Sequence, residues 1–260
     1  MAARLTVRDV SLRFGGVKVL DDVGFVVEPG RIFGLVGPNG AGKTSLFNCI
    51  SGHYRPSSGS ILIDDTEVVG LPPARLATQG LARTFQHPAL RLHATVLDNV
   101  MLGSHTRLPG TPIEWAMRLP RTVRAEKALR DEALGLLERV ELGWAAHRTA
   151  DELSHGLHKS IELARALLMH PTLLLLDEPA AGLSHSEVER FIATVRRVRD
   201  EDDITIVIVE HHMGVISAVT DRIVVLDHGR TLMEGTAAEA KADPRVVEAY
   251  LGRDAADDAA

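Results

Sequence analysis

The chain has 260 residues, of which 45% are hydrophobic, and a formal net charge of −6. Its longest apolar runs, at residues 204–209 and 173–176, are far shorter than the roughly 18–20 residues that a transmembrane helix needs. We expect no signal peptide, because no basic segment followed by an apolar stretch opens the given sequence. The acidic balance argues against non-specific nucleic-acid binding, and the single cysteine, Cys49, excludes an internal disulfide framework. We therefore expect a folded cytosolic protein, for which any work at a membrane needs a partner.

The first part of the chain reads as strands broken by turns. Strands are predicted at residues 5–10, 23–27, 31–36 and 60–63, with turns at Gly15 and Gly16 and at residues 28–30. A glycine-rich loop follows the third of these strands. After the loop, residues 44–50 have helical character, and Gly52 suits the end of that helix.

Residues 87 to about 151 differ, because the strand patterns stop there. Residues 126–140 are amphipathic, with apolar side chains at helical spacing: Leu129, Ala133, Leu136, Leu137 and Val140. The sequence therefore predicts a helical subdomain, at about residues 87–157, inserted into an α/β core.

The α/β pattern then resumes. Helices are predicted at residues 161–168 and 187–199, strands at residues 173–176 and 204–209, and a hairpin of residues 223–226 and 231–233 around a turn at residues 227–230. Strands that alternate with helices imply a mostly parallel sheet covered on both faces. We expect one domain over residues 1–252 and a flexible acidic tail at residues 253–260.

Residues 37–44 match the phosphate-loop pattern in full, between a predicted strand and a predicted helix. Glycines let backbone N–H groups turn inward around phosphates, and the helix N-terminus adds its positive dipole end. Lys43 is expected to reach the β- and γ-phosphates, and the Thr44 hydroxyl to bind Mg²⁺. The predicted binding set is Gly37, Pro38, Asn39, Gly40, Ala41, Gly42, Lys43, Thr44 and Ser45.

Two carboxylates, Asp177 and Glu178, follow the apolar run of residues 173–176. In an open parallel sheet the active crevice lies at the carboxyl ends of the strands, where this pair would emerge. We expect Asp177 to hold Mg²⁺, directly or through water, and Glu178 to orient and deprotonate an attacking water. The alternative is an ordinary acidic turn before Pro179, which the upstream phosphate loop disfavours.

Residues 153–157, Leu-Ser-His-Gly-Leu, precede a helix for which Ser154 is a suitable N-cap. With the phosphate loop and the acidic strand, in this order and spacing, they resemble the nucleotide-binding subunits of ATP-binding cassette (ABC) transporters. The resemblance extends through about Gly252. It implies a RecA-like P-loop NTPase core with an antiparallel β subdomain and an inserted α-helical subdomain, which binds and hydrolyses ATP with Mg²⁺.

The resemblance also implies an obligate pair of subunits. In the family, the residues matching Ser154 and Gly156 contact the γ-phosphate of ATP held by the opposite ATPase subunit, which is either identical or a paralogue. A helix N-terminus with free N–H groups is a suitable anion site for that contact.

This chain departs from the family pattern at two places. The usual motif is Leu-Ser-Gly-Gly-Gln, but His155 replaces its first glycine and Leu157 its glutamine. A leucine cannot hydrogen-bond a ribose, so we leave Leu157 out of the site. Ser184 stands where the family usually has an aspartate that communicates across the dimer, which leaves the coupling there open.

Three further roles come from the resemblance alone. Phe14 is expected to stack on adenine, although a core phenylalanine is the alternative. Gln86 is expected to sense Mg²⁺ and link ATP to the transporter, and a solvated glutamine is the alternative. His211 is expected to reach the γ-phosphate. The expected catalytic residues are thus Glu178, His211 and Gln86, and the expected magnesium ligands are Thr44, Gln86 and Asp177.

The chain has 12 histidines, among them His155 with His158 and the adjacent His211 and His212. Structural zinc sites use sets of cysteine and histidine, and Cys49 alone supplies no such set. On the sequence alone we interpret the histidines as individually placed.

Several stretches resemble one branch of the family, the branched-chain (hydrophobic) amino-acid importer ATPases of bacteria: residues 37–48, 80–86, 177–182, 209–213 and 249–252. This implies a subunit at the cytoplasmic face of the inner membrane, paired with two integral membrane permeases and indirectly with a substrate-binding protein. The solute would touch those partners and not this chain. The alternatives are a lipopolysaccharide-export ATPase, a non-transport ABC ATPase, and a phosphate-loop kinase or GTPase, which would lack Ser154 and Gly156.

Overall fold

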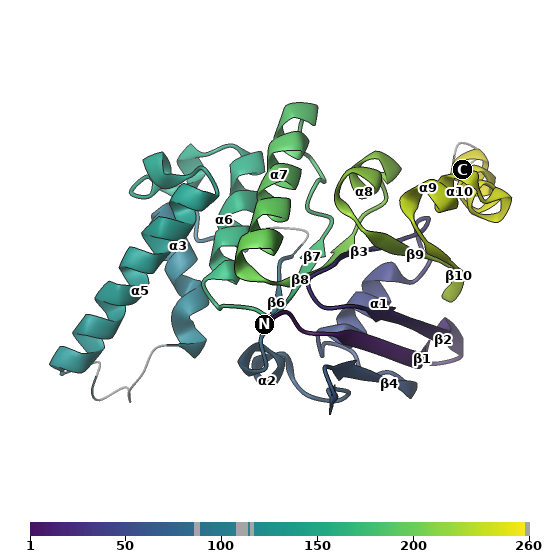
Figure 1. The fold of residues 1–260 in the computed structure, drawn as a ribbon, viewed down its shortest axis with the longest axis horizontal. Helices are drawn as coiled ribbons and strands as arrows, with labels where there is room; N and C mark the ends of the chain where they lie inside the picture. The colour runs from purple at the N-terminus through teal and green to yellow at the C-terminus, as the bar shows by residue number, and fades with distance from the viewer. Residues whose placement is uncertain (86–88, 108–113, 115–116, 258–260) are drawn as a thin grey trace. The chain divides into compact units, whose positions relative to one another are not determined.

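The computed structural model describes residues 1–85, 89–107, 114 and 117–257, and the chain divides into two compact units (Figure 1). The first unit comprises Met1–Arg83, Thr172–Ala181 and Val195–Ala260, and the second comprises Thr84–Pro171 and Gly182–Thr194. The strands of the described residues all belong to the first unit. Gln86 lies outside the described residues, so its expected role stays a prediction.

A six-stranded sheet with the order β10-β9-β3-β8-β7-β6 lies at the centre of the first unit. Its strands are β3 (Ile32–Val36), β6 (Leu81–Arg83), β7 (Leu173–Asp177), β8 (Thr205–Val209), β9 (Arg222–Asp227) and β10 (Arg230–Gly235). All neighbouring pairs are parallel except the β9–β10 hairpin. Every residue of β3, β7 and β8 is buried, as expected when both faces of a sheet are covered. The mostly parallel sheet and the hairpin predicted from the sequence are confirmed.

A four-stranded antiparallel sheet, with the order β2-β1-β4-β5, belongs to the same unit. It contains β1 (Leu5–Phe14), β2 (Val17–Val27), β4 (Ser58–Ile63) and β5 (Thr66–Glu67). Strand β1 ends at Phe14 and not at residue 10 as predicted, because an irregularity in its pairing with β2 interrupts the apolar alternation there. The register shifts between Val7 and Val10, where Asp9 has a φ of 48°, and the apolar alternation then resumes in another phase.

The hydrophobic core of the first unit combines the two sheets with α1 (Lys43–Ile50) (Figure 1). Alternate residues of the parallel strands face this core, including Phe33 and Leu35 of β3. The ring of Phe33 stacks on that of Phe25 of β2, with 5.2 Å between centroids. Each fully buried side chain of this kind stabilises the fold by about 1.5–3 kcal/mol. Cys49 is a free cysteine in this core, and burial raises the pKa of its thiol to about 11.

The other face of the parallel sheet is covered by helices. Gly34 of β3 marks a close approach there, because a Cβ at Gly34 would lie 2.8 Å from Ile223 and 3.1 Å from Thr220, directly after α8. The remaining helices of the unit are α2 (Pro73–Thr78), α8 (Met213–Val219), α9 (Ala237–Ala242), α10 (Pro244–Asp257) and the second part of α7 (His185–Asp202). Helix α10 continues past residue 253, where we expected the tail to begin.

The second unit is built from helices that pack on one another: α3 (Val96–Met101), η1 (Leu102–Thr106), α5 (Pro120–Arg139), η2 (Gly143–Ala145), η3 (Ala150–Glu152), α6 (His155–Leu167) and the start of α7. Helix α5 buries Leu129, Ala133, Leu136 and Leu137, as their spacing predicts. Asn99, fully buried in α3, bonds to Arg91 through both its amide oxygen and its amide nitrogen, and so fastens the preceding loop. In the part of the chain that the structure describes, no helix combines the length and the apolar character needed to span a bilayer.

Candidate nucleotide-binding site

The backbone of the loop between β3 and α1 accommodates only glycine at positions 37 and 42. Gly37, Gly40 and Gly42 have φ values of 148°, 73° and 100°. A Cβ at Gly37 would lie 2.2 Å from the carbonyl oxygen of Leu226, and one at Gly42 would lie 2.9 Å from the side chain of Leu20. These approaches and torsions allow the loop to curl tightly at the start of α1. The curled loop has the form that a phosphate-binding loop requires.

Lys43 lies inside this loop. Its side chain is buried, and Nζ donates to the carbonyl oxygens of Gly37 at 2.6 Å and Pro38 at 2.9 Å. Gly42, the N-cap of α1, provides no side-chain cap, so the first-turn N–H groups are presented at the loop. The Thr44 side chain is exposed and Ser45 is half-buried. The Lys43 ammonium group and the helix N-terminus both place positive charge at the loop, which suits an anion.

Asp177 ends β7 and forms a buried ion pair with Arg83, the last residue of the neighbouring strand β6. Arg83 Nη2 donates to Asp177 Oδ2 at 2.7 Å, and the two side chains are 8% and 9% exposed. Arg83 also donates through Nη1 to Asn48 and Ser51 and lies over the ring of Phe47. Our sequence reasoning missed Arg83, although it lies at the carboxyl end of a strand, the position that singled out Asp177.

Glu178, Glu210 and His211 lie together where β7 and β8 end. Glu178 has a φ of 44°, and its N–H donates to the carbonyl oxygen of Val209 at 3.0 Å. Glu210 is fully buried, and its Oε1 accepts a hydrogen bond from the Ala180 N–H at 2.8 Å. His211 Nδ1 lies 3.9 Å from Glu178 Oε1 and 3.9 Å from Glu210 Oε2. The structure thus brings the expected base and the expected γ-phosphate histidine together.

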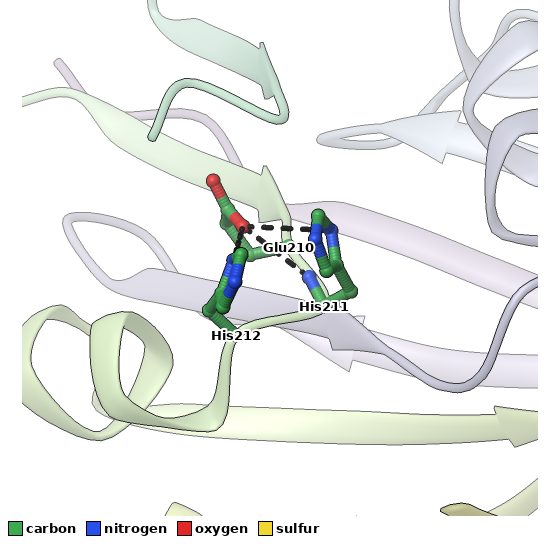
Figure 2. Close-up of side chains that lie close together, drawn as sticks. All are labelled: Glu210, His211 and His212. Atoms are coloured by element: carbon green, nitrogen blue, oxygen red, sulfur yellow. Dashed lines mark hydrogen bonds and ion pairs between the residues drawn. The ribbon is translucent and has the colours of Figure 1, made fainter. Parts of the chain in front are cut away.

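Glu210 is a second residue that the sequence reasoning missed. Burial is the largest influence on its carboxyl and raises its pKa, with repulsion from Glu178 adding to this effect. The Ala180 N–H and the two neighbouring imidazoles, shown in Figure 2, act in the opposite direction. A charged residue directly after the apolar run of β8 was the signal that could have revealed it, since strand ends of this kind line the crevice of a parallel sheet.

Phe14 lies at the end of β1 with a half-exposed ring. Its ring meets that of Tyr54 edge-on, with 5.2 Å between centroids and an interplanar angle of 81°. It is therefore not a core phenylalanine. An aromatic ring that keeps part of its surface in solvent can stack on a base, so the expectation for Phe14 stays open.

Ser154 and Gly156 belong to the second unit. Ser154 is the N-cap of α6, as expected, and it is exposed and makes no side-chain cap bond. A Cβ at Gly156 would lie 2.4 Å from Glu187 Oε1 and 3.2 Å from the side chain of Leu183, so a larger residue in the first turn of α6 would displace Glu187. Leu157 lines a cavity of about 220 Å³ together with Trp144 and Phe191.

Ser184, the residue in place of the expected aspartate, stabilises the start of α7. Its N–H and its hydroxyl both donate to Glu187 Oε2, at 2.8 Å and 2.6 Å. These two bonds lower the pKa of Glu187. Ser184 therefore has a local structural role at the start of α7.

Comparison with known proteins decides the family. The protein-family model described as "ABC transporter" matches residues 20–181, a span that holds the phosphate loop, Ser154 and the pair Asp177 and Glu178. The chain belongs to the ABC transporter family. A second model, described as "Branched-chain amino acid ATP-binding cassette transporter", matches residues 230–256.

Relatives of known role match nearly the whole chain. The high-affinity branched-chain amino acid transport ATP-binding protein LivG of Escherichia coli K12 is 37% identical over 248 residues, which covers 95% of this chain and 97% of LivG. BraF of Pseudomonas aeruginosa, a protein with the same description, is 36% identical with the same coverage. The ADP conformation of MJ1267, an ATP-binding cassette of an ABC transporter, has a TM-score of 0.85 at 29% identity and covers 97% of this chain and 100% of its own.

This membership confirms the predicted ABC ATPase fold and identifies the chain as an ATP-binding transporter ATPase. The roles of the individual site residues, as distinct from their positions, stay predictions.

Proposed function

We propose that this chain is the ATP-binding and ATP-hydrolysing subunit of a bacterial importer for branched-chain amino acids. The observation that carries the proposal is the 37% identity to LivG along 95% of the chain. A second observation supports the proposal: the branched-chain transporter family model matches residues 230–256. This segment lies outside the phosphate loop and the acidic strand that all ABC ATPases need.

Magnesium, when present, would be held by Thr44, Asp177 and Gln86. The hydroxyl oxygen of Thr44, in the first turn of α1, and the carboxylate oxygens of Asp177, the last residue of β7, are ligands that suit this hard cation. When bound, the ion neutralises phosphate charge. Arg83 orients the Asp177 carboxylate through the bond to Oδ2.

Hydrolysis is proposed to proceed with Glu178 as the base. Lys43 exchanges its bonds to the Gly37 and Pro38 carbonyls for bonds to the β- and γ-phosphates. Glu178 takes a proton from a water whose oxygen forms a bond to the γ-phosphorus, while the bond from that phosphorus to the bridging oxygen breaks. The products are ADP and phosphate. His211, on the adjacent strand end, bonds to the γ-phosphate, and Phe14 stacks on the adenine.

The partners follow from an incomplete site. Ser154 and Gly156 are proposed to contact the γ-phosphate of ATP on a second ATPase subunit, identical or paralogous, with the bare N-terminus of α6 supplying N–H donors. The pair would work with two integral membrane permeases at the cytoplasmic face of the inner membrane, and indirectly with a substrate-binding protein. The single domain over residues 1–252, with its helical part at about 87–157, is proposed as the ATPase module.

The test is transport in proteoliposomes that contain this chain, its co-purifying permeases and the second ATPase subunit, with ATP inside and binding protein and labelled leucine outside. We expect uptake that depends on internal ATP. Lys43→Ala should weaken nucleotide binding by about 10–100-fold, because charged hydrogen bonds worth about 1.5–3 kcal/mol are lost, and uptake should fail at limiting ATP. Lys241→Ala, in the exposed last turn of α9, is the matched control. Hydrolysis without uptake of leucine, isoleucine or valine would exclude the proposed substrate class.

A further inference from the structure

Three potential metal ligands converge directly after β8. Glu210, His211 and His212 are consecutive, and Figure 2 shows both imidazole rings turned toward the Glu210 carboxylate. Nδ1 of each ring lies 3.9 Å from Glu210 Oε2. One ligand atom from each residue lies within 4.8 Å of the other two, and among the described residues no other three His, Cys, Asp or Glu side chains converge in this way.

The cluster combines a buried carboxylate with two partly exposed imidazole rings. Glu210 is fully buried and is fastened by the Ala180 N–H on Oε1 and the His211 N–H, at 3.3 Å, on Oε2. The side chains of His211 and His212 are 39% and 63% exposed. The two backbone N–H groups therefore hold the carboxylate in place. The exposed imidazole rings have space to rotate, and an ion from solvent can reach them.

We propose that Glu210, His211 and His212 bind one divalent transition-metal ion of the zinc class, through Oε2 and two imidazole nitrogens, with the remaining coordination positions open to water. Two nitrogen ligands and one carboxylate suit Zn²⁺ and its neighbours, whereas Mg²⁺ and Ca²⁺ prefer oxygen alone. This site is therefore distinct in chemistry from the proposed magnesium site. The two do not compete for the same ion.

The geometry requires only small side-chain movements. Bonds of about 2.0–2.1 Å in tetrahedral geometry place ligand atoms roughly 3.3 Å apart. The observed separations of 3.9 Å from Oε2 to each Nδ1 close to that value by rotation of exposed rings. Glu178 Oε1, 3.9 Å from His211 Nδ1, adds a second negative charge beside the site.

Occupancy of the site would inhibit ATP hydrolysis, and this consequence rests on the proposed function of His211. A metal-bound His211 is held against Glu210 and cannot bond to the γ-phosphate. The metal site would then act as a reversible inhibitory switch. Binding itself does not depend on that role, so the two can be tested apart.

Binding is tested on the full chain without an affinity tag and stripped of metal. Zn²⁺ is titrated by calorimetry, and Co²⁺ by its visible absorption. We expect one ion per chain, and His212→Asn should weaken binding at least about 10-fold, because one ligand is lost. The matched control is His228→Asn, another exposed histidine of the same unit, on the β9–β10 turn. Unchanged Zn²⁺ binding by the His212→Asn variant overturns the site, as does equal weakening in the control.

Inhibition is tested by ATP hydrolysis at saturating magnesium-ATP with and without Zn²⁺. We expect Zn²⁺ to inhibit the unmodified chain and the His228→Asn control, and to spare His212→Asn, whose rate without Zn²⁺ stays normal. Binding of Zn²⁺ that leaves hydrolysis unaffected would overturn the link through His211 while the site stands. Loss of hydrolysis in all variants without Zn²⁺ would instead count against the proposed function.

Discussion

Glu178 is positioned by backbone contacts that its neighbours make. Its φ of 44° is an uncommon torsion for a residue with a side chain, and such torsions cost about 1–3 kcal/mol. The cost is offset where the surroundings hold the turn, here by the Glu178 N–H on Val209 and the Ala180 N–H on Glu210. Buried Glu210 therefore fixes the backbone turn after β7 that carries Glu178, and it precedes His211 in the chain.

Glu178→Gln should lower the turnover number for ATP by about 10²–10⁴-fold, because the amide cannot accept the proton of the attacking water. The affinity for ATP should stay within about twofold, since the amide keeps the size of the carboxylate and the loop is untouched. Single-turnover hydrolysis and nucleotide titration measure the two quantities. Glu189→Gln, an exposed carboxylate on α7, should leave both unchanged. Normal turnover in the Glu178→Gln variant would remove Glu178 as the base.

At the scale of elements, Arg83 holds three of them together. It joins the end of β6 to Asp177 of β7 and to Asn48 and Ser51 of α1 and its cap, while its guanidinium stacks on Phe47. A buried arginine with several partners gives orientation that a surface pair does not. The helix behind the phosphate loop and the strand that bears Asp177 are thus connected by one side chain.

Arg83→Met should lower the free energy of unfolding by about 3–5 kcal/mol, because it leaves the Asp177 carboxylate buried without its cation. Urea denaturation measures the change. The comparison is Arg31→Met, whose 63% exposed side chain lies 3.8 Å from Asp221 and should contribute about 1 kcal/mol or less. Equal effects of the two substitutions would show that the buried pair does not stabilise the fold in this way.

The sequence predicted those elements whose signal is local. Strands β3, β7 and β8 are continuous apolar runs, and α1 follows a complete phosphate-loop motif, so their bounds agree with the prediction to within one residue. Helices α2, α8 and α9 were missed because they span six or seven residues, too few to show periodicity. Helix α5 begins at Pro120, six residues before the predicted start. Proline is common at the first position of a helix, so Pro120 is a sequence signal for this start.

The presence or absence of a local sequence signal also explains which site residues could be predicted. The loop, Asp177 and Glu178 are readable because each motif is contiguous. The bond from Arg83 to Asp177 joins residues 94 positions apart, and that from Ala180 to Glu210 joins residues 30 apart. No pattern within one segment encodes such pairings, which depend on the order of the strands in the sheet.

In the proposed mechanism, one catalytic site is divided between two chains. The phosphate loop, Asp177, Glu178 and His211 belong to the first unit, whereas Ser154 and Gly156 belong to the second. The central claim is that the N-terminus of α6 completes the site of another subunit. ATP should then be the ligand that joins two subunits.

The most direct measurement is the mass of the Glu178→Gln variant by light scattering with magnesium-ATP, alone and mixed with its second ATPase subunit. We expect an ATP-dependent particle of two subunits in at least one of these samples. The added Ser154→Arg substitution should abolish this particle, because the arginine occupies the place of the γ-phosphate contact. Two results together would contradict the claim: the Glu178→Gln variant stays monomeric in both samples, and a Ser154→Ala variant of the otherwise unmodified chain hydrolyses ATP at full rate as a monomer.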